Sequence, residues 1–465
     1  MVEKEERPVV REGESVCPRC FMRIPSKMVE QDGMIFMEKT CPEHGLFSVP
    51  ISRYAWYFTG LRSYYDSLVA RNEPPDAKDQ AMYTLFLNMR CNMNCPICFT
   101  DANRDYSEPD LAFIEKSLEG MHGVQINLFG GEPTVRDDLP EIISIVRKSG
   151  NIPLLFTNGL KLVDIDYLRS LKEAGLEEVH LQFDGFEEAA YLRFRRQRLV
   201  DTKVKGLENL KELDIATVLE TTIARDVNSD QLNRILDYAV HNDFIKAIAF
   251  RSYSVLGKAG LGPDSCFTLE DLVDLLDLQT NGRINLRDVF FFQRMLFALF
   301  HILGISTCFY NHYYLLYRRE GGEYDTISEL VDIDGLEYDP EDLKTNIPGF
   351  IARLLPRFTS AGARKVMWDI LATMADRLGY GQRFYYSQHR HTRDMLVLGF
   401  EKACDRYTFD YEHVSNCPGG EITTTDGITT SFSLGNIKRD KKAVQRGRSG
   451  PKPTSSDDSP CRSIG

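Results

Sequence analysis

The 465-residue sequence lacks an excess of basic residues, an apolar leader and a long uncharged apolar run. It has 56 Lys and Arg residues against 68 Asp and Glu residues, a formal net charge of −12. A broad nucleic-acid-binding face needs clustered positive charge, so we expect no nucleic-acid partner. The first eleven residues are rich in charge and do not resemble a signal peptide, which predicts a reducing, cytoplasmic setting.

The strongest apolar segment, residues 289–306, is interrupted by Gln293 and Arg294. A charged side chain at that depth is costly in a bilayer. We therefore predict no membrane span. We interpret the segment as a buried helix or as the wall of an apolar pocket.

Cysteine is plentiful, with eleven residues, and six of them lie in two tight clusters. One cluster, Cys91-x3-Cys95-x2-Cys98, follows an apolar run typical of a buried strand. Three thiolates this close together can hold three irons of a [4Fe–4S] cube and leave the fourth iron open. A small molecule with an amine and a carboxylate, such as S-adenosylmethionine (SAM), can chelate that iron. A structural zinc site or three unrelated core cysteines are the alternatives.

The other cluster consists of two ligand pairs, Cys17-x2-Cys20 and Cys41-x2-His44. This donor set predicts a closed tetrahedral metal site with three sulfurs and one nitrogen. Zinc is the default occupant, and a rubredoxin-like mononuclear iron is the alternative. The metal replaces a hydrophobic core that so short a segment can barely build. An Asp32-Gly33 pair between the two halves indicates a hairpin turn.

From about residue 81, short apolar strands alternate with amphipathic helices, which predicts an α/β fold with a partial (β/α)6 barrel. The predicted strands are 83–87, 124–129, 153–157, 178–183, 216–223 and 246–251, and the predicted helices are 110–121, 139–149, 165–174, 198–213 and 229–241. Function in such barrels lies at the C-terminal ends of the strands. Three of these ends carry the segments GGEP (130–133), TNG (157–159) and QFDG (182–185). Each alone is a common turn, but their order after the cysteine triplet is far more specific.

Together these segments resemble the radical SAM superfamily. The stretches RCNMNCPICF, LFGGEPTVRDDL, FTNGLKL and LQFDGF, preceded by CPRC and CPEHG, are similar to one branch of it. That branch contains the archaeal tetraether lipid synthases and related pterin methylases. The likeness covers residues 15–260 well and later residues poorly. It implies an enzyme that reductively cleaves SAM at a [4Fe–4S] cluster to a 5′-deoxyadenosyl radical, which abstracts hydrogen from an unreactive carbon.

The resemblance also implies roles for single residues and for partners. The cluster would be held by Cys91, Cys95 and Cys98, and SAM would be contacted by Gly130, Gly131, Glu132, Asn158, Gln182, Asp184 and Arg195. The substrate would be a lipid-like or pterin-like small molecule that is alkylated or joined through a carbon–carbon bond. Electrons would come from a donor such as ferredoxin or flavodoxin.

The sequence departs from that branch in its cysteines. Ser433 stands where a cysteine is expected, and the usual cysteine-rich insert is absent. Five cysteines remain outside the two clusters, and no two of them form a short motif: Cys266, Cys308, Cys404, Cys417 and Cys461. A second cube normally takes four thiolates, so we predict one [4Fe–4S] cluster per chain.

The composition divides the chain into five parts. They are a metal-binding module resembling a rubredoxin or zinc knuckle (1–50), a linker that is helical at first (51–80), the barrel (81–262), a mainly helical substrate cap with a degenerate auxiliary region (263–437), and a disordered tail (438–465). Thr268-x-x-Asp271 predicts a capping box at the start of a helix in the cap.

Two other functions compete with a radical SAM enzyme. One is a catalytically inactive iron–sulfur or SAM-binding scaffold, and the other is an electron-transfer protein that uses both metal sites. The intact cysteine triplet and the GGEP segment favour the enzyme. Production of 5′-deoxyadenosine separates the three.

Overall fold

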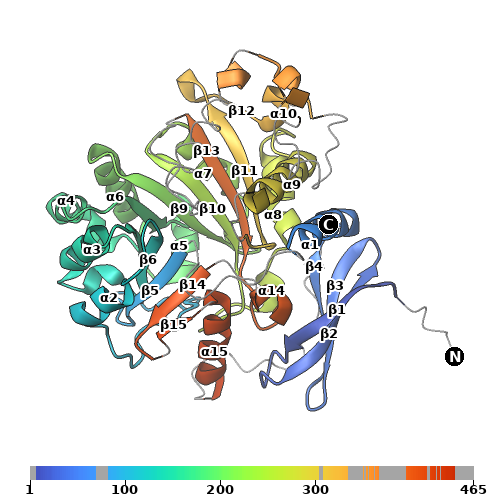
Figure 1. The fold of residues 1–465 in the computed structure, drawn as a ribbon, viewed down its shortest axis with the longest axis horizontal. Helices are drawn as coiled ribbons and strands as arrows, with labels where there is room; N and C mark the ends of the chain where they lie inside the picture. The colour runs from blue at the N-terminus through green and yellow to red at the C-terminus, as the bar shows by residue number, and fades with distance from the viewer. Residues whose placement is uncertain are drawn as a thin grey trace.

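The computed structural model describes residues 7–69, 82–302, 307–333, 349, 352–353, 355–360, 362–365, 394–415, 419–425, 427–429 and 431–445. These residues form two sheets, a small one at the N-terminus and a large one built from the rest of the chain (Figure 1). Cys417 and Cys461 lie outside the described residues.

The N-terminal sheet has four antiparallel strands in chain order. They are β1 (Val9–Val16), β2 (Arg23–Gln31), β3 (Met34–Cys41) and β4 (Gly45–Ser52). Asp32 and Gly33 both have positive φ, 52° and 75°, which is the backbone that a two-residue hairpin turn requires. The predicted hairpin is therefore confirmed. Because the first and third turns of such a sheet lie at the same end, the two predicted ligand pairs meet there.

All six strands predicted from the β/α alternation are present as parallel neighbours in chain order. They are β5 (Met82–Asn88), β6 (Gln125–Gly130), β7 (Ile152–Thr157), β8 (Glu178–Gln182), β9 (Ala216–Ile223) and β10 (Ile245–Ser252). The helices between them are α2 (Leu111–Ser117), α3 (Leu139–Lys148), α4 (Ile165–Glu173), α5 (Glu188–Arg195), α6 (Val200–Glu212) and α7 (Leu232–Val240). Their parallel order places the C-terminal ends of the strands at one edge.

The C-terminal region adds both helices and strands. Its helices are α8 (Leu269–Gln279), α9 (Leu286–Ile302), α10 (Ile327–Leu330), α14 (Tyr411–Ser415) and α15 (Phe432–Gln445), and the predicted capping box opens α8. Its strands are β11 (Asn311–Arg318), β12 (Tyr324–Asp325), β13 (Met395–Lys402), β14 (Gly419–Thr423) and β15 (Gly427–Thr429). The sequence did not reveal these strands, because short continuous apolar runs cannot be told from buried helical segments by periodicity.

The added strands extend both edges of the predicted barrel sheet. β13 lies parallel to β10, and β14 lies parallel to β5 at the opposite edge. β11 continues the first edge antiparallel to β13, and β15 continues the second antiparallel to β14. In Figure 1 these late strands, in yellow-orange to red, flank the green and blue strands of the β/α repeats.

One helix lies in the part of the linker that the sequence predicted to be helical, and another extends into the predicted tail. α1 (Ala55–Val69) packs against α9, with the Tyr57 and Phe290 ring centroids 5.5 Å apart. α15 extends to Gln445, so residues 438–445 are helical instead of belonging to a disordered tail. Its buried Asp440 pairs with Arg406 (2.6 Å). This contact with a distant segment stabilises a helix that local composition does not favour.

The interpretation of residues 289–306 as a buried helix is confirmed by α9 over its described length. The Gln293 side chain accepts a hydrogen bond from the Tyr313 backbone N–H of β11 (2.9 Å). The Arg294 guanidinium lies over the Tyr64 ring of α1, 4.7 Å from its centroid. In the described part of the chain, no helix combines the length and the apolar character needed to cross a bilayer.

Candidate active site

The cysteine loop, residues 89–98, follows the C-terminal end of β5 and lies against the GGEP segment. The backbone N–H groups of Gly131 and Glu132 donate to the carbonyls of Asn88 (3.0 Å) and Arg90 (2.8 Å). A Cβ atom on Gly131 would lie 2.4 Å from the Arg90 oxygen. The glycine is therefore needed so that this segment can approach the backbone leading into Cys91.

A second segment, residues 257–260, holds the other end of the cysteine loop, and we call it the clamp segment. Its Lys258 and Gly260 N–H groups donate to the carbonyls of Cys98 (2.9 Å) and Pro96 (3.0 Å). Gly257 has a φ of +61°, and a Cβ there would lie 2.3 Å from the Cys98 oxygen. This segment was not predicted from the sequence, although its G-x-x-G pattern after the sixth strand is a signal of close backbone approach.

Substitution Gly257→Ala is expected to displace the cysteine loop, because the new methyl group meets backbone atoms that cannot move aside. We expect reconstituted protein to bind clearly less iron and to form less 5′-deoxyadenosine. Gly262→Ala is the matched control, since a Cβ at that position has no atom within 4 Å among the described residues. Equal iron content in the two variants would contradict the clamp role.

The thiols of Cys91, Cys95 and Cys98 are each half-buried. Backbone N–H groups of the loop donate to the sulfurs of Cys91 (3.3 Å) and Cys98 (3.4 Å), the kind of contact that tunes iron–sulfur clusters. Burial raises the pKa of Cys91 to about 12, and a metal that binds this thiol displaces its proton. Three such thiols on one short loop fit the donor set of a cube with an open iron.

The Glu132 carboxylate joins the ends of β6 and β7. It is almost fully buried, and it accepts hydrogen bonds from Thr134, from the Thr157 hydroxyl (2.7 Å) and from the Asn158 backbone N–H (2.7 Å). The Asn158 amide in turn lies 3.9 Å from the Cys91 sulfur. The carboxylate therefore fixes the C-terminal end of β7 relative to the cysteine loop.

Gln182, Asp184 and Arg195, which the resemblance assigned to SAM binding, form a buried network of polar contacts at the C-terminal end of β8. Arg195 pairs with both oxygens of Asp184 (2.8 and 3.0 Å) and also lies against the Cys95 thiol. Gln182 donates to Asp184 (2.6 Å). The bidentate pair fixes the guanidinium beside the cysteine loop.

Lys203, on α6, was not identified from the sequence and completes this network. Its ammonium donates to the Asn158 carbonyl, the Gln182 carbonyl (2.8 Å) and the Gln182 side-chain oxygen (2.7 Å). Burial lowers the pKa of Lys203 to about 7, although the nearby Asp184 acts in the opposite direction. The sequence contains a signal for this burial, because Lys203 lies on the same helix face as the apolar residues Leu207 and Leu210.

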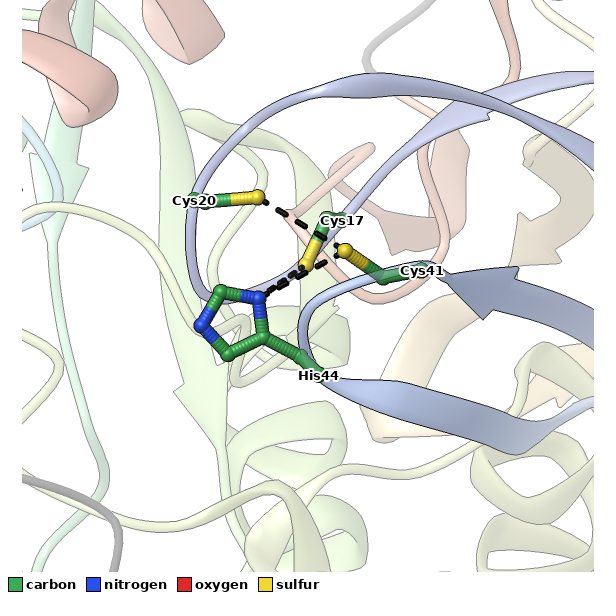
Figure 2. Close-up of side chains that lie close together, drawn as sticks. All are labelled: Cys17, Cys20, Cys41 and His44. Carbon is green, nitrogen blue, oxygen red and sulfur yellow. Dashed lines mark hydrogen bonds between the residues drawn. The ribbon is translucent and has the colours of Figure 1, made fainter.

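Figure 2 shows Cys17, Cys20, Cys41 and His44 pointing toward one another at the end of the N-terminal sheet. Their ligand atoms all lie within 4.8 Å of one another. The His44 Nδ1 atom is 3.6 Å from the Cys17 sulfur and 3.5 Å from the Cys41 sulfur, and the Cys20 and Cys41 sulfurs are 3.8 Å apart. Three thiol sulfurs and one imidazole nitrogen around one point fit a single tetrahedral ion.

Comparison with known proteins matches residues 87–239 to the model of the radical SAM superfamily. A curated relative from Methanocaldococcus jannaschii, 7,8-dihydro-6-hydroxymethylpterin dimethyltransferase, is 31% identical over 91% of this chain and 93% of its own length. The chain belongs to the radical SAM superfamily. As a radical SAM enzyme it works with a [4Fe–4S] cluster and SAM.

Other comparisons concern parts of this radical SAM chain. Residues 9–53 match the model of the HMPTM N-terminal zinc ribbon domain, so the N-terminal module is a zinc ribbon with a metal. Fe-coproporphyrin III synthase of Methanosarcina barkeri is 31% identical over 41% of this chain and 49% of its own length. The crystal structure of Streptococcus suis SuiB bound to S-adenosylmethionine matches with a TM-score of 0.38 and 18% identity, over 44% of this chain and 48% of that one.

A cavity of about 200 Å³ lies inside the radical SAM barrel. It is lined by residues of β5 to β10 and by late elements, including Glu401 of β13 and Asn436 of α15. Phe99, directly after Cys98, forms part of its wall. The cavity therefore begins beside the cysteine loop, where a substrate of this enzyme class must lie.

Proposed function

We propose that this enzyme adds one-carbon groups to a carbon of a reduced pterin or a closely related bicyclic ring. The observation that carries the proposal is the alignment with the pterin dimethyltransferase, which spans nearly the full length of both chains. Both the zinc ribbon and the barrel are included in it. An inactive scaffold or a simple electron carrier would not need a cavity of this size beside the cysteine loop.

The size of the cavity supports a pterin over a long lipid. At roughly 10–15 Å³ for each water-sized group, the cavity of about 200 Å³ holds on the order of 13 to 20 such groups. That is enough for a bicyclic ring with a short side chain. An isoprenoid chain of archaeal length would extend far outside it.

In the proposed site, Cys91, Cys95 and Cys98 hold the cluster, and Cys17, Cys20, Cys41 and His44 hold the ribbon metal. The SAM contacts come from Gly130, Gly131, Glu132, Asn158, Gln182, Asp184 and Arg195. When bound, the reduced cluster supplies the electron that cleaves SAM into methionine and a carbon radical. The chain's own contribution is placement: Glu132 and Lys203 fix the strand ends, and the cavity walls exclude water from the reacting carbon.

The test is an anaerobic assay of reconstituted protein with SAM, a chemical reductant and 7,8-dihydro-6-hydroxymethylpterin. We expect 5′-deoxyadenosine and methionine from the SAM molecules that are cleaved, together with a pterin whose mass has increased by added methyl groups. Those methyl groups come from a separate one-carbon donor, which is excess SAM (released as S-adenosylhomocysteine) in one arm of the assay and an added tetrahydropterin carrying a methylene group in the other. Ferredoxin or flavodoxin is expected to replace the chemical reductant. Release of 5′-deoxyadenosine without any modified pterin would refute the substrate, and its absence would favour the scaffold or electron-transfer function.

A further inference from the structure

The walls of the cavity follow from the alternation of side chains along strands. Residues two apart point to the same face, and the cavity is lined by such pairs on several strands. They include Gln125 and Asn127 on β6, Val218 and Glu220 on β9, Ala249 and Arg251 on β10, and Gly399 and Glu401 on β13. The small residues Ala249 and Gly399 leave room in the cavity. Arg251 and Glu401, two positions further along the same strands, close one end of it.

Flat groups form another wall. The His180 ring of β8 stacks on the Phe156 ring of β7, with centroids 4.0 Å apart and planes inclined by 19°. Phe129 of β6 meets Phe156 edge to face at 5.7 Å. All three line the cavity. A planar aromatic ligand can stack on such a surface, and a flexible chain gains less from it.

The charged wall is an ordered row of groups. The His180 Nδ1 atom contacts Glu220 (2.8 Å), and Arg251 bridges Glu220 (3.0 Å) and the Oε2 atom of Glu401 (2.5 Å). Among the described residues, no donor contacts the other oxygen of Glu401, Oε1. Burial raises the pKa of Glu401, yet Arg251 lies at hydrogen-bonding distance to it. The row thus ends in an acceptor that is held in place and still available.

Gln125 supplies an independent indication of a ligand from the β6 side of the cavity. Its side chain is buried, at 3% exposure, and lines the cavity. Neither its amide nitrogen nor its amide oxygen has a hydrogen-bond partner among the described residues. Leaving a buried amide unpaired is costly, so folded proteins rarely keep one without a reason. The simplest partner is a ligand with both donors and acceptors.

We propose that this cavity binds the ring of a pterin, with the Oε1 atom of Glu401 accepting a hydrogen bond from the ring amino group and the Gln125 amide pairing with another polar edge of the ring. The proposal rests on the proposed function and specifies which residues form hydrogen bonds with the substrate. A hydrogen bond to an ionised carboxylate is about twice as strong as one between neutral groups, and Arg251 holds the other oxygen of Glu401 in place. Stacking on Phe156 and His180 then orients the ring plane.

The test compares the binding of two ligands by equilibrium dialysis with the full-length, anaerobically reconstituted protein. One is 6-hydroxymethylpterin, and the other is 6-hydroxymethyllumazine, in which a carbonyl replaces the amino group. We expect wild-type protein to bind the pterin at least about tenfold more tightly, because the lumazine carbonyl would face the Glu401 carboxylate. The Glu401→Gln variant is expected to bind the pterin about tenfold more weakly and to lose the preference, because its amide can donate to the lumazine carbonyl.

Glu119→Gln, at an exposed glutamate after α2, is the matched control and is expected to keep wild-type affinities for both ligands. Iron content and melting temperature show whether the Glu401→Gln variant is folded. If wild-type protein binds and methylates the pterin while the Glu401→Gln variant keeps the same affinity and preference, this inference is wrong and the proposed function stands. If wild-type protein cleaves SAM but neither binds 6-hydroxymethylpterin nor methylates its 7,8-dihydro form, both are wrong.

Gln125→Leu provides a second measurement that does not depend on a charge. The leucine removes an unpaired buried amide, so the ligand-free variant is expected to melt no lower than wild-type protein. Its affinity for 6-hydroxymethylpterin is expected to fall about tenfold. A purely structural role for Gln125 would give the opposite combination, a lower melting temperature with unchanged affinity.

Discussion

Replacing Cys91, Cys95 or Cys98 by alanine is expected to abolish the formation of 5′-deoxyadenosine from SAM. In the proposed site each of these thiols holds one iron, so the loss of any one opens the cube. Changes outside the ligand shell of metal sites already cost about 10–100-fold, and loss of a ligand should exceed that. Anaerobic reconstitution followed by quantification of 5′-deoxyadenosine and bound iron measures the effect.

Cys266→Ala is the matched control for these variants. Cys266 is buried at 5% exposure in an apolar cluster that also contains Ile97, and it belongs to neither ligand group, so its substitution should leave SAM cleavage intact. Wild-type rates from any of the three loop variants would refute the cluster site. A [4Fe–4S] signal in the triple alanine variant would show a second cluster on the remaining cysteines and refute the expectation of one per chain.

Loss of the ribbon metal should have the second-largest effect. We expect Cys17→Ser and His44→Ala to release the ion and to unfold the four-stranded sheet, because binding of a structural zinc contributes roughly 10–16 kcal/mol to the folding of small domains. Elemental analysis and limited proteolysis of residues 9–52 measure the two consequences. The visible absorbance of the iron–sulfur cluster should remain, since its ligands come from a different loop.

The contacts between ribbon and barrel sharpen that expectation. Lys39 of β3 donates to the Arg406 carbonyl (3.1 Å), and the Ser15 hydroxyl lies 2.5 Å from the Phe409 carbonyl. Residues 405–410 therefore lose contacts when the ribbon unfolds, and the melting temperature of the whole chain should fall. If the cluster absorbance were lost from the Cys17→Ser protein, the two metal sites would not be independent.

The sequence was sufficient for the parts of the molecule that depend on local pattern. The six β/α strands and the turn at Asp32 and Gly33 have periodicities or residue types that a short window reveals. Asn158 and Arg195 could be proposed because strand ends meet at one edge of a parallel sheet. The structure places both beside the cysteine loop.

The remainder depends on contacts between distant segments. Glu401 reaches Arg251 across 150 residues, and nothing near either residue indicates the other. The clamp segment contacts Cys98 only because, in the folded sheet, the end of β10 lies next to the cysteine loop that follows β5. Strand β14 likewise pairs with β5 from more than three hundred positions along the chain. Such pairings are set by the closing of the whole sheet, and a single sequence does not encode them locally.

The late strands at both edges of the sheet have a consequence for the order in which the enzyme is assembled. A ribosome releases β5 to β10, with the cysteine loop, before β13, β14 and α15 exist, and folding proceeds from the N-terminus during synthesis. The nascent chain therefore passes through a form in which the loop is complete while the walls containing Glu401 and Asn436 are missing. The cavity is therefore completed only after the last elements have been synthesised and β13 and β14 have paired with β10 and β5.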